Sequence, residues 1–183
     1  MEITRLGVMG GTFNPIHLGH LMIAEEARQA FHLKKVLFVP SYITPNKDVC
    51  GATAEQRLAM TRLATADNPY FTVSDMEMRR QGNSYTVDTL RLLKEIYGPS
   101  HSLYFISGTD TIHDLHNWNN PEEILSLCQF IGATRPDGSE QIDSIISSFG
   151  ELGKTFSNCR SRRWKSLRQN SGAAFAWACP SAI

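Results

Sequence analysis

Short continuous apolar runs recur along the first three quarters of the chain. Runs of about four to eight residues, set between polar segments, are typical of strands that are buried on both faces of a sheet. The pattern predicts strands at residues 3–9, 35–40, 71–74, 103–107 and 129–134.

Helical spacing fills the intervals between these runs. Thr53 and Gln56 belong to a capping box that opens one helix, and Asn120 caps another that begins with Pro121. Further helices are expected at residues 21–28, 86–97 and 142–149. The alternation of strands and helices predicts an α/β protein with a parallel sheet built from βαβ units.

Length and composition restrict the class of protein. A chain of 183 residues suits one domain with a good core. No run of about 18 apolar residues occurs, and the N-terminus lacks a signal-peptide pattern. The four cysteines show no metal-site spacing. We therefore expect a reduced, cytoplasmic protein without a membrane or nucleic-acid partner; homo-oligomerisation stays open.

Charge divides the chain into two unequal parts. The net charge is zero, but residues 1–153 hold 12 basic and 18 acidic residues, whereas residues 154–183 hold six basic residues and no acidic one. Such a split marks the end of the chain as compositionally different. We therefore expect a main domain over residues 1–153 and an atypical tail over residues 154–183.

The segment between the first strand and the first helix carries the strongest chemical signal. It reads GGTFNPIHLGH from Gly10 to His20. Small residues at the strand end let the backbone approach a ligand, and a helix N-terminus offers free N–H groups to an anion. His17 and His20 lie three residues apart, so both rings face one side of a helical turn. The segment predicts a phosphate-binding corner.

The corner differs from the two commonest phosphate-binding motifs. It contains neither the Gly-x-Gly-x-x-Gly of dinucleotide sites nor the Gly-Lys-Ser/Thr of a Walker loop. It resembles the Gly-x-Phe-x-Pro-x-His-x-Gly-His motif of the His-x-Gly-His nucleotidyltransferases. That resemblance implies a Rossmann-like, doubly wound parallel sheet with helices on both faces.

Later motifs make the resemblance more specific. The chain has Lys47 in a polar loop, SYTVDTL from Ser84, GTD from Gly108, WNN from Trp118 and TRP from Thr134. This ordered set resembles the bacterial nicotinate-nucleotide adenylyltransferases over residues 2 to about 153. The resemblance implies transfer of the adenylyl group of ATP to nicotinate mononucleotide, with Mg²⁺ accompanying ATP and no dedicated protein metal site.

The resemblance also implies roles for individual residues. His17 and His20 would contact the ATP phosphates as the catalytic pair, Trp118 would stack on the nicotinate ring, and Tyr85 and Thr86 would receive the nicotinate carboxylate. The remaining expected nucleotide contacts are Gly10, Gly11, Thr12, Phe13, Asn14, Gly19, Lys47, Gly108, Asp110 and Arg135.

Several of these residues have an ordinary structural alternative. Asp110 fits a helix N-cap as well as a nucleotide contact, and Trp118 fits core packing. Tyr85 and Thr86 fit simple helix capping, while Lys47 and Arg135 fit solvated surface charges.

The tail departs from the family. The family ends with a strand and an Ile-Ser-Ser/Ala-Thr-x-x-Arg turn that holds the ATP phosphates, and nothing in residues 154–183 matches it. Reading the codons of residues 164–183 from each third base permits Glu-Ile-Ser-Ser-Thr-Glu-Leu-Arg. We hypothesise a frameshift near Gly153 and Lys154; a natural lineage-specific tail is the alternative. Because polar residues interrupt any β pattern after Lys154, no strand is expected there.

Three functions remain in competition. The leading one is a nicotinate-nucleotide adenylyltransferase. A sister enzyme would use nicotinamide mononucleotide or phosphopantetheine instead. A nucleotide-binding protein that has lost catalysis with the C-terminal motif is the third.

Overall fold

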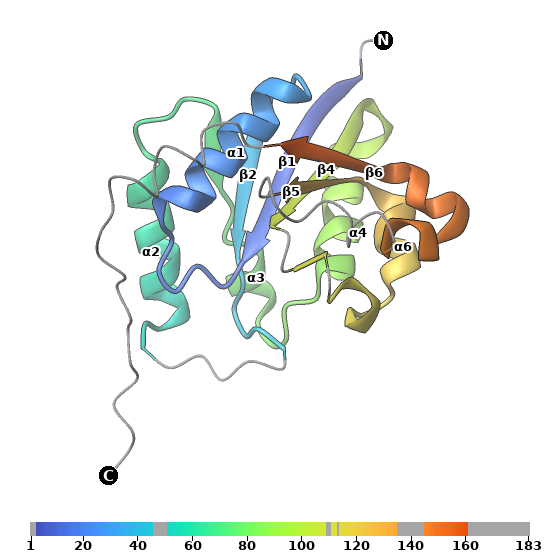
Figure 1. The fold of residues 1–183 in the computed structure, drawn as a ribbon. Helices are drawn as coiled ribbons and strands as arrows, with labels where there is room; N and C mark the ends of the chain where they lie inside the picture. The colour runs from blue at the N-terminus through green and yellow to red at the C-terminus, as the bar shows by residue number, and fades with distance from the viewer. Residues whose placement is uncertain (1–2, 46–50, 109–110, 113, 135–144, 161–183) are drawn as a thin grey trace, which may run out of the picture.

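The protein is built around one twisted sheet in which six described strands run parallel (Figure 1). The computed structural model describes residues 3–45, 51–108, 111–112, 114–134 and 145–160. The strands are β1 (Thr4–Gly11), β2 (Lys35–Pro40), β3 (Phe71–Val73), β4 (His101–Gly108), β5 (Gln129–Thr134) and β6 (Phe156–Arg160). The helices are α1 (Leu18–Ala30), α2 (Ala54–Thr65), α3 (Met76–Arg80), α4 (Thr86–Tyr97) and α6 (Pro121–Leu127), with short 3-10 turns η1 (Gly98–Ser100), η2 (Leu115–Asn117) and η3 (Gly150–Thr155).

The strand order is β3-β2-β1-β4-β5-β6. In β1, Gly7 lies opposite Val36 of β2 on one side and Tyr104 of β4 on the other. The chain therefore winds outward from β1 in one direction and then, from β4, in the other. In doubly wound sheets, ligands bind outside the carboxyl ends of the strands at this switch point.

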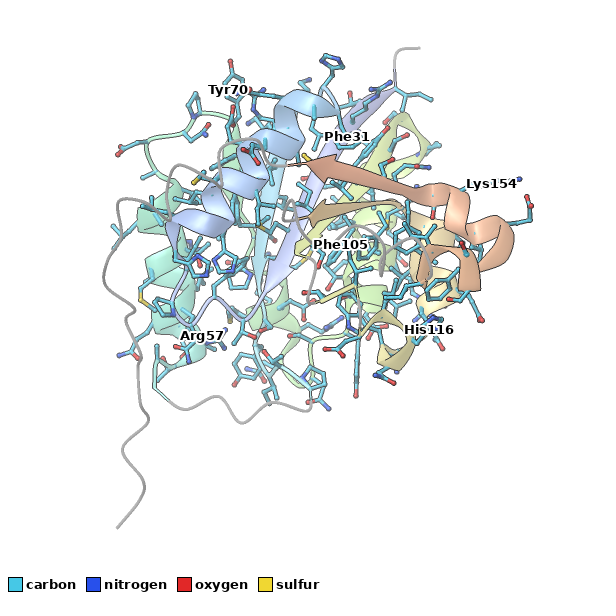
Figure 2. All side chains as sticks on the ribbon, viewed as in Figure 1. Phe31, Arg57, Tyr70, Phe105, His116 and Lys154 are labelled. Carbon is cyan, nitrogen blue, oxygen red and sulfur yellow. The ribbon has the colours of Figure 1, made fainter. Side chains whose placement is uncertain are left out.

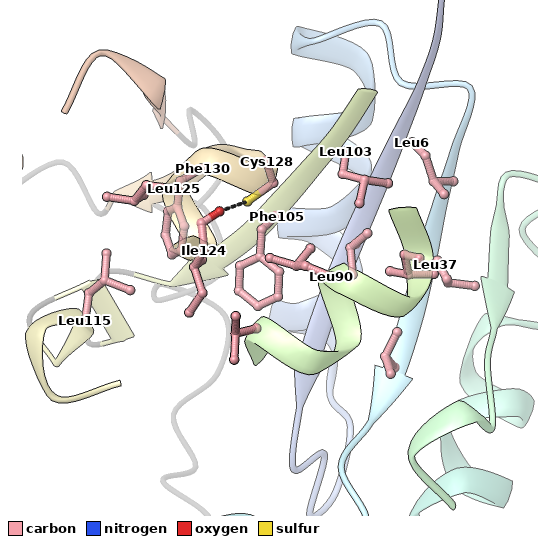
Figure 3. Packing of buried hydrophobic residues seen from close by; sticks show 14 of the residues in the cluster. Leu6, Leu37, Leu90, Leu103, Phe105, Leu115, Ile124, Leu125, Cys128 and Phe130 are labelled. Carbon is pink, nitrogen blue, oxygen red and sulfur yellow. Dashed lines mark hydrogen bonds between the residues drawn. The ribbon is translucent and has the colours of Figure 1, made fainter. Parts of the chain in front are cut away.

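Helices cover both faces of the sheet, as the resemblance implied (Figure 1). On one face, α4 and α6 bury Leu90 and Ile124 against Phe105 and Phe130 of the central strands (Figure 3). On the other face, α1 packs the small side chain of Ala24 against the core around Phe38 of β2 and Ile131 of β5. Since both faces of the strands are covered, their sequences are continuously apolar.

The helix ends agree with the sequence in most respects. Thr53 accepts a hydrogen bond from the Gln56 N–H, and the Gln56 side chain accepts one from the Thr53 N–H, so the predicted capping box is formed. Asn120 occupies the predicted N-cap position of α6, but its side chain makes no capping hydrogen bond. In α4, Leu90 is buried as its spacing predicted, whereas Ile96 is 59% exposed.

The prediction that no strand forms after Lys154 is wrong. Residues Phe156–Arg160 pair in parallel with β5, and Phe130 lies opposite Phe156 in the register. The centroids of the Phe130 and Phe156 rings lie 5.1 Å apart, and Cys159 is buried on the face of the sheet that α1 covers. Pairing with a neighbour and the burial of alternate side chains outweigh the weak β propensity of this segment. Phe175 and Trp177, which we expected to be loosely packed, lie outside the described residues.

No helix among the described residues is long and apolar enough to cross a membrane.

Candidate active site

A cavity of about 670 Å³ opens at the carboxyl ends of β1, β2 and β4. Gly10 and Gly11 end β1, Ser41 directly follows β2, and Ser107 lies near the end of β4. The cavity therefore occupies the switch point of the sheet. Its lining also includes residues from α3, the start of α4 and the segment around η2.

The corner after β1 has a constrained backbone. Phe13 is buried and adopts a positive φ of 48°, which is uncommon for a non-glycine residue. A Cβ on Gly11 would lie 3.1 Å from the Phe13 ring, a close contact that would oblige the ring to shift. The Thr12 hydroxyl meets the Thr44 hydroxyl at 2.9 Å, which ties the corner to the loop after β2.

His17 and His20 stand together at the start of α1. Their rings stack with centroids 3.8 Å apart, as the three-residue spacing predicted. The His20 ring also meets the edge of Phe13 at 5.1 Å. The His17 backbone N–H donates to His20 Nδ1 at 3.3 Å, so the proton of the neutral ring is assigned to Nε2. His20 thus keeps one N–H donor for a ligand.

Burial keeps both rings neutral. It lowers the pKa of His17, and it lowers the pKa of His20 to about 4, with a smaller contribution from the neighbouring His17 charge. At pH 7 both residues are therefore hydrogen-bonding groups rather than fixed cations. A bound polyanion would raise both pKa values, because an opposite charge favours the protonated form.

The opposite side of the cavity carries the expected acceptor residues. Tyr85 is the N-cap of α4, yet its side chain makes no capping hydrogen bond to the first backbone N–H groups of this 12-residue helix. Tyr85 and Thr86 both line the cavity, and so does Trp118. The Trp118 ring is half-buried and meets Phe105 edge-on at 5.9 Å. Core packing and a role in the cavity are therefore compatible for this indole.

The structure brings part of the predicted set together. Gly10, Gly11, Thr12, Tyr85, Thr86 and Trp118 line the cavity. The lining does not include the predicted residues Phe13, Asn14, His17, Gly19, His20 and Gly108, which lie in or beside the β1–α1 corner and at the end of β4. Lys47, Asp110 and Arg135 lie outside the described residues, so their predicted roles stay predictions.

Two polar residues of the site were missed by the sequence analysis. Glu77 of α3 is 3% exposed and lines the cavity, where it pairs with Arg80 and accepts a hydrogen bond from Thr89. Arg57 of α2 is 2% exposed and bonds to the loops on the cavity wall. Arg57 follows the predicted capping box as a charge within a helix, which normally indicates a solvated face, and Glu77 lies in a segment where no helix was expected.

The described cysteines take no part in the site. Cys128 is buried and donates to the Ile124 carbonyl at 3.2 Å (Figure 3), and burial raises the pKa of its thiol to about 12. Burial also raises the pKa of Cys159. Within the described ranges, no group of three or more His, Cys, Asp or Glu side chains could hold a metal ion.

Comparison with known proteins identifies the family. The cytidylyltransferase-like family model matches residues 8–167. A probable nicotinate-nucleotide adenylyltransferase of Moorella thermoacetica is 53% identical over 72% of this chain and 61% of its own length. A protein of the same name from Geobacter sulfurreducens is 44% identical over 94% of this chain and 79% of its own length.

The fold has a solved relative as well. Nicotinic acid mononucleotide adenylyltransferase of Plasmodium falciparum, solved in complex with NaAD, superposes with a TM-score of 0.71. The match covers 87% of this chain and 76% of the other at 19% identity, so it shows the shared fold. The family model and the two bacterial relatives show more than the fold: this chain belongs to the cytidylyltransferase-like family and, within it, to the nicotinate-nucleotide adenylyltransferases.

Proposed function

We propose that this protein transfers the adenylyl group of ATP to nicotinate mononucleotide, giving nicotinate adenine dinucleotide and pyrophosphate. One observation carries the proposal. A single cavity at the switch point of the sheet joins the Gly10–Thr12 corner to the start of α4 and to Trp118. The expected phosphate-binding corner and the Trp118 ring thereby share one continuous surface, which supports a site for two nucleotide substrates. The relatives' names agree with this assignment.

The reaction needs alignment more than covalent chemistry. A phosphate oxygen of nicotinate mononucleotide attacks the α-phosphorus of ATP, a new P–O bond forms, and the bond from the α-phosphorus to the bridging oxygen breaks. Pyrophosphate leaves with that oxygen, so no enzyme intermediate is needed. The protein has to hold two polyanions in line and stabilise the charge of the transition state.

His17 and His20 supply part of that stabilisation. A neutral His20 donates from Nε2 to a phosphate oxygen, and the donor becomes stronger as negative charge develops during transfer. The β1–α1 corner adds backbone N–H groups at the start of α1. Mg²⁺, held mainly by phosphate oxygens and water, would neutralise further charge.

Tyr85, Thr86 and Trp118 bind the acceptor. The indole offers a flat face to the nicotinate ring, and its edge is fixed by Phe105. The N–H groups at the start of α4 donate hydrogen bonds to the nicotinate carboxylate, since the helix N-terminus favours an anion. Nicotinamide mononucleotide lacks this negative charge, so the site would discriminate against it.

A turnover comparison tests the function. The protein is incubated with MgATP and, in parallel, nicotinate mononucleotide, nicotinamide mononucleotide or phosphopantetheine, and pyrophosphate release is measured. We expect the highest kcat/KM for nicotinate mononucleotide. A higher value for either other acceptor would assign the chain to a sister reaction. Tight mononucleotide binding without pyrophosphate release would favour the binding protein that the missing C-terminal motif suggests.

A further inference from the structure

Helix α2 buries a polar face instead of an apolar one. Arg57, Thr61 and Thr65 are its buried residues, whereas Leu63 is 77% exposed. The two threonine hydroxyls donate back to carbonyls one turn earlier, at 2.8 and 2.9 Å. That leaves Arg57 as the residue of this face whose side chain reaches beyond its own helix. Figure 2 shows Arg57 where α2 approaches the chain that leaves β1.

The Arg57 guanidinium holds two backbone carbonyls from different loops. One terminal nitrogen donates to the Thr12 oxygen at 2.5 Å, and the other donates to the Tyr42 oxygen at 2.9 Å. Thr12 itself lines the cavity, and Tyr42 lies between the cavity residues Ser41 and Thr44. A planar fork with two fixed donors therefore sets the spacing between two segments of the cavity wall.

The bond to Thr12 acts at the strained point of the corner. Thr12 and Phe13 share a peptide plane, and Phe13 has the positive φ. In a trans peptide the carbonyl and the following N–H point in opposite directions. Because Arg57 holds the Thr12 oxygen, the Phe13 N–H is directed away from Arg57. Rotation of this peptide would break the bond between Arg57 and the Thr12 carbonyl.

The same connection continues to the acceptor side. The Ser41 hydroxyl bonds to the Thr44 hydroxyl at 2.7 Å, and the Tyr42 N–H donates to the Ser84 hydroxyl at 2.9 Å. Ser84 directly precedes Tyr85, and its N–H donates to the Ile43 carbonyl at 2.8 Å. One hydrogen-bonded series therefore joins the corner, the loop after β2 and the start of α4.

Burial of this side chain is costly for the fold. Arg57 forms no ion pair with any residue in the described part of the chain, and its Nε has no hydrogen-bond partner there. A buried charge without a counter-ion is unfavourable, and an apolar side chain of similar volume is often at least as stable. Stability alone therefore gives a weak reason for an arginine at this position.

We propose that Arg57 is a positioning residue for adenylyl transfer: by holding the Thr12 and Tyr42 carbonyls it fixes the Thr12–Phe13 peptide and the separation of the two loops, and so aligns the phosphates. This inference rests on the proposed function. Its role is distinct from that of His20, because Arg57 acts through the backbone carbonyls of Thr12 and Tyr42 and not through a hydrogen bond to the phosphates.

The test compares Arg57→Met and Arg57→Lys with the control Thr65→Val. Thr65 is equally enclosed on the same helix, but its hydroxyl bonds only to α2 carbonyls. Tm, kcat and both KM values are measured, and the affinity for a non-hydrolysable ATP analogue is obtained by calorimetry. For Arg57→Met we expect kcat to fall about 100-fold, as for a misplacement of reacting groups, with weaker analogue binding. Arg57→Lys should recover only part of kcat, because it cannot hold both carbonyls.

The outcomes separate the two proposals. A structural role alone would give Arg57 variants with the kcat, KM and analogue affinity of Thr65→Val, and that result overturns the inference. If Arg57→Met does not fold, Arg57→Lys decides: wild-type kcat in a lysine variant contradicts the positioning role. If the wild-type chain itself shows no transfer, the proposed function fails, and analogue binding still tests Arg57.

Discussion

The two sides of the cavity are built differently. The corner side is formed by Gly10–Thr12 and the loop from Ser41 to Thr44. Hydrogen bonds hold it in place, including one from the buried Arg57, and the residue that follows it, Phe13, has a positive φ. On the acceptor side, formed by Tyr85, Thr86 and Trp118, the Trp118 ring packs against the buried core residue Phe105. Figure 2 places Phe105 at the centre of the molecule and Arg57 toward its edge.

This difference matches what each side has to bind. Phosphates need directed donors, and donors on loops must be fixed by other polar groups. A flat ring needs a rigid apolar face, which the core supplies directly. The corner side should therefore govern the rate of transfer, and the acceptor side should govern affinity for the mononucleotide.

The largest effect should come from restoring the C-terminal motif that the family resemblance places on the ATP phosphates. The chain lacks the Ser-Thr turn and arginine that the family resemblance places on the ATP phosphates. A protein expressed with the shifted frame after Gly153 should gain at least about 10²–10³-fold in kcat, the effect of one positioned donor, and should have a higher Tm. Sequencing the gene around the codons for Glu151–Thr155 and assaying both proteins tests this frameshift proposal. Full activity of the chain as printed would contradict it.

Removing the His20 donor, which stands beside the corner side at the start of α1, should be next in size. In a protein with the intact C-terminus, His20→Ala should lower kcat, because it removes an aligned N–H donor. The loss of transition-state stabilisation should be about 2–4 kcal/mol. Steady-state kinetics measure this, with Leu18→Ala at the exposed neighbouring position as the control. A His20→Ala enzyme with near-normal kcat would show that this ring is not catalytic.

Truncating the acceptor side should affect a different constant. Trp118→Ala should raise KM for nicotinate mononucleotide by a factor equivalent to about 1–3 kcal/mol of binding free energy, the range found for base–aromatic stacking. KM for ATP should change little. Trp118→Phe serves as the matched variant, since it keeps an aromatic face. Equal losses for both substrates would instead identify Trp118 as a core residue that supports the whole cavity.

The smallest expected effect concerns pH and the stacked histidines. The pKa of His20 is about 4 in the folded protein against an ordinary value of 6.5, so the unfolded chain binds more protons between these values. Stability should therefore decrease as the pH falls from about 6.5 to about 4. Denaturant titrations of wild type and His20→Gln over this range measure the effect. The same pH slope in both proteins would remove His20 as its source.

The sequence predicted the parts of the molecule that are encoded locally. Continuous apolar runs located β1 to β5, and the Gly10–His20 segment located the corner and the shared side of its two histidines. Both predictions depend only on residues that are close together in the sequence and on their spacing.

The features that were missed depend on distant partners. In α2 the apolar Leu63 is exposed and the charged Arg57 is buried, because the Arg57 guanidinium bonds to the loops after β1 and β2. Likewise, β6 forms because the edge of β5 is available for pairing, although the polar Ser157 interrupts the apolar pattern of β6. Buried polar groups and edge strands are set by tertiary packing, so their sequence signal is weak.

Calorimetric binding of nicotinate mononucleotide tests the division between the two sides most directly, since it does not require turnover. The ligand is titrated into the chain as printed and into its His20→Ala and Trp118→Ala variants. We expect His20→Ala to keep the wild-type affinity within about threefold, and Trp118→Ala to lose at least about tenfold, equivalent to about 1.4 kcal/mol. Loss of affinity in His20→Ala together with wild-type affinity in Trp118→Ala would contradict the assignment of the two sides.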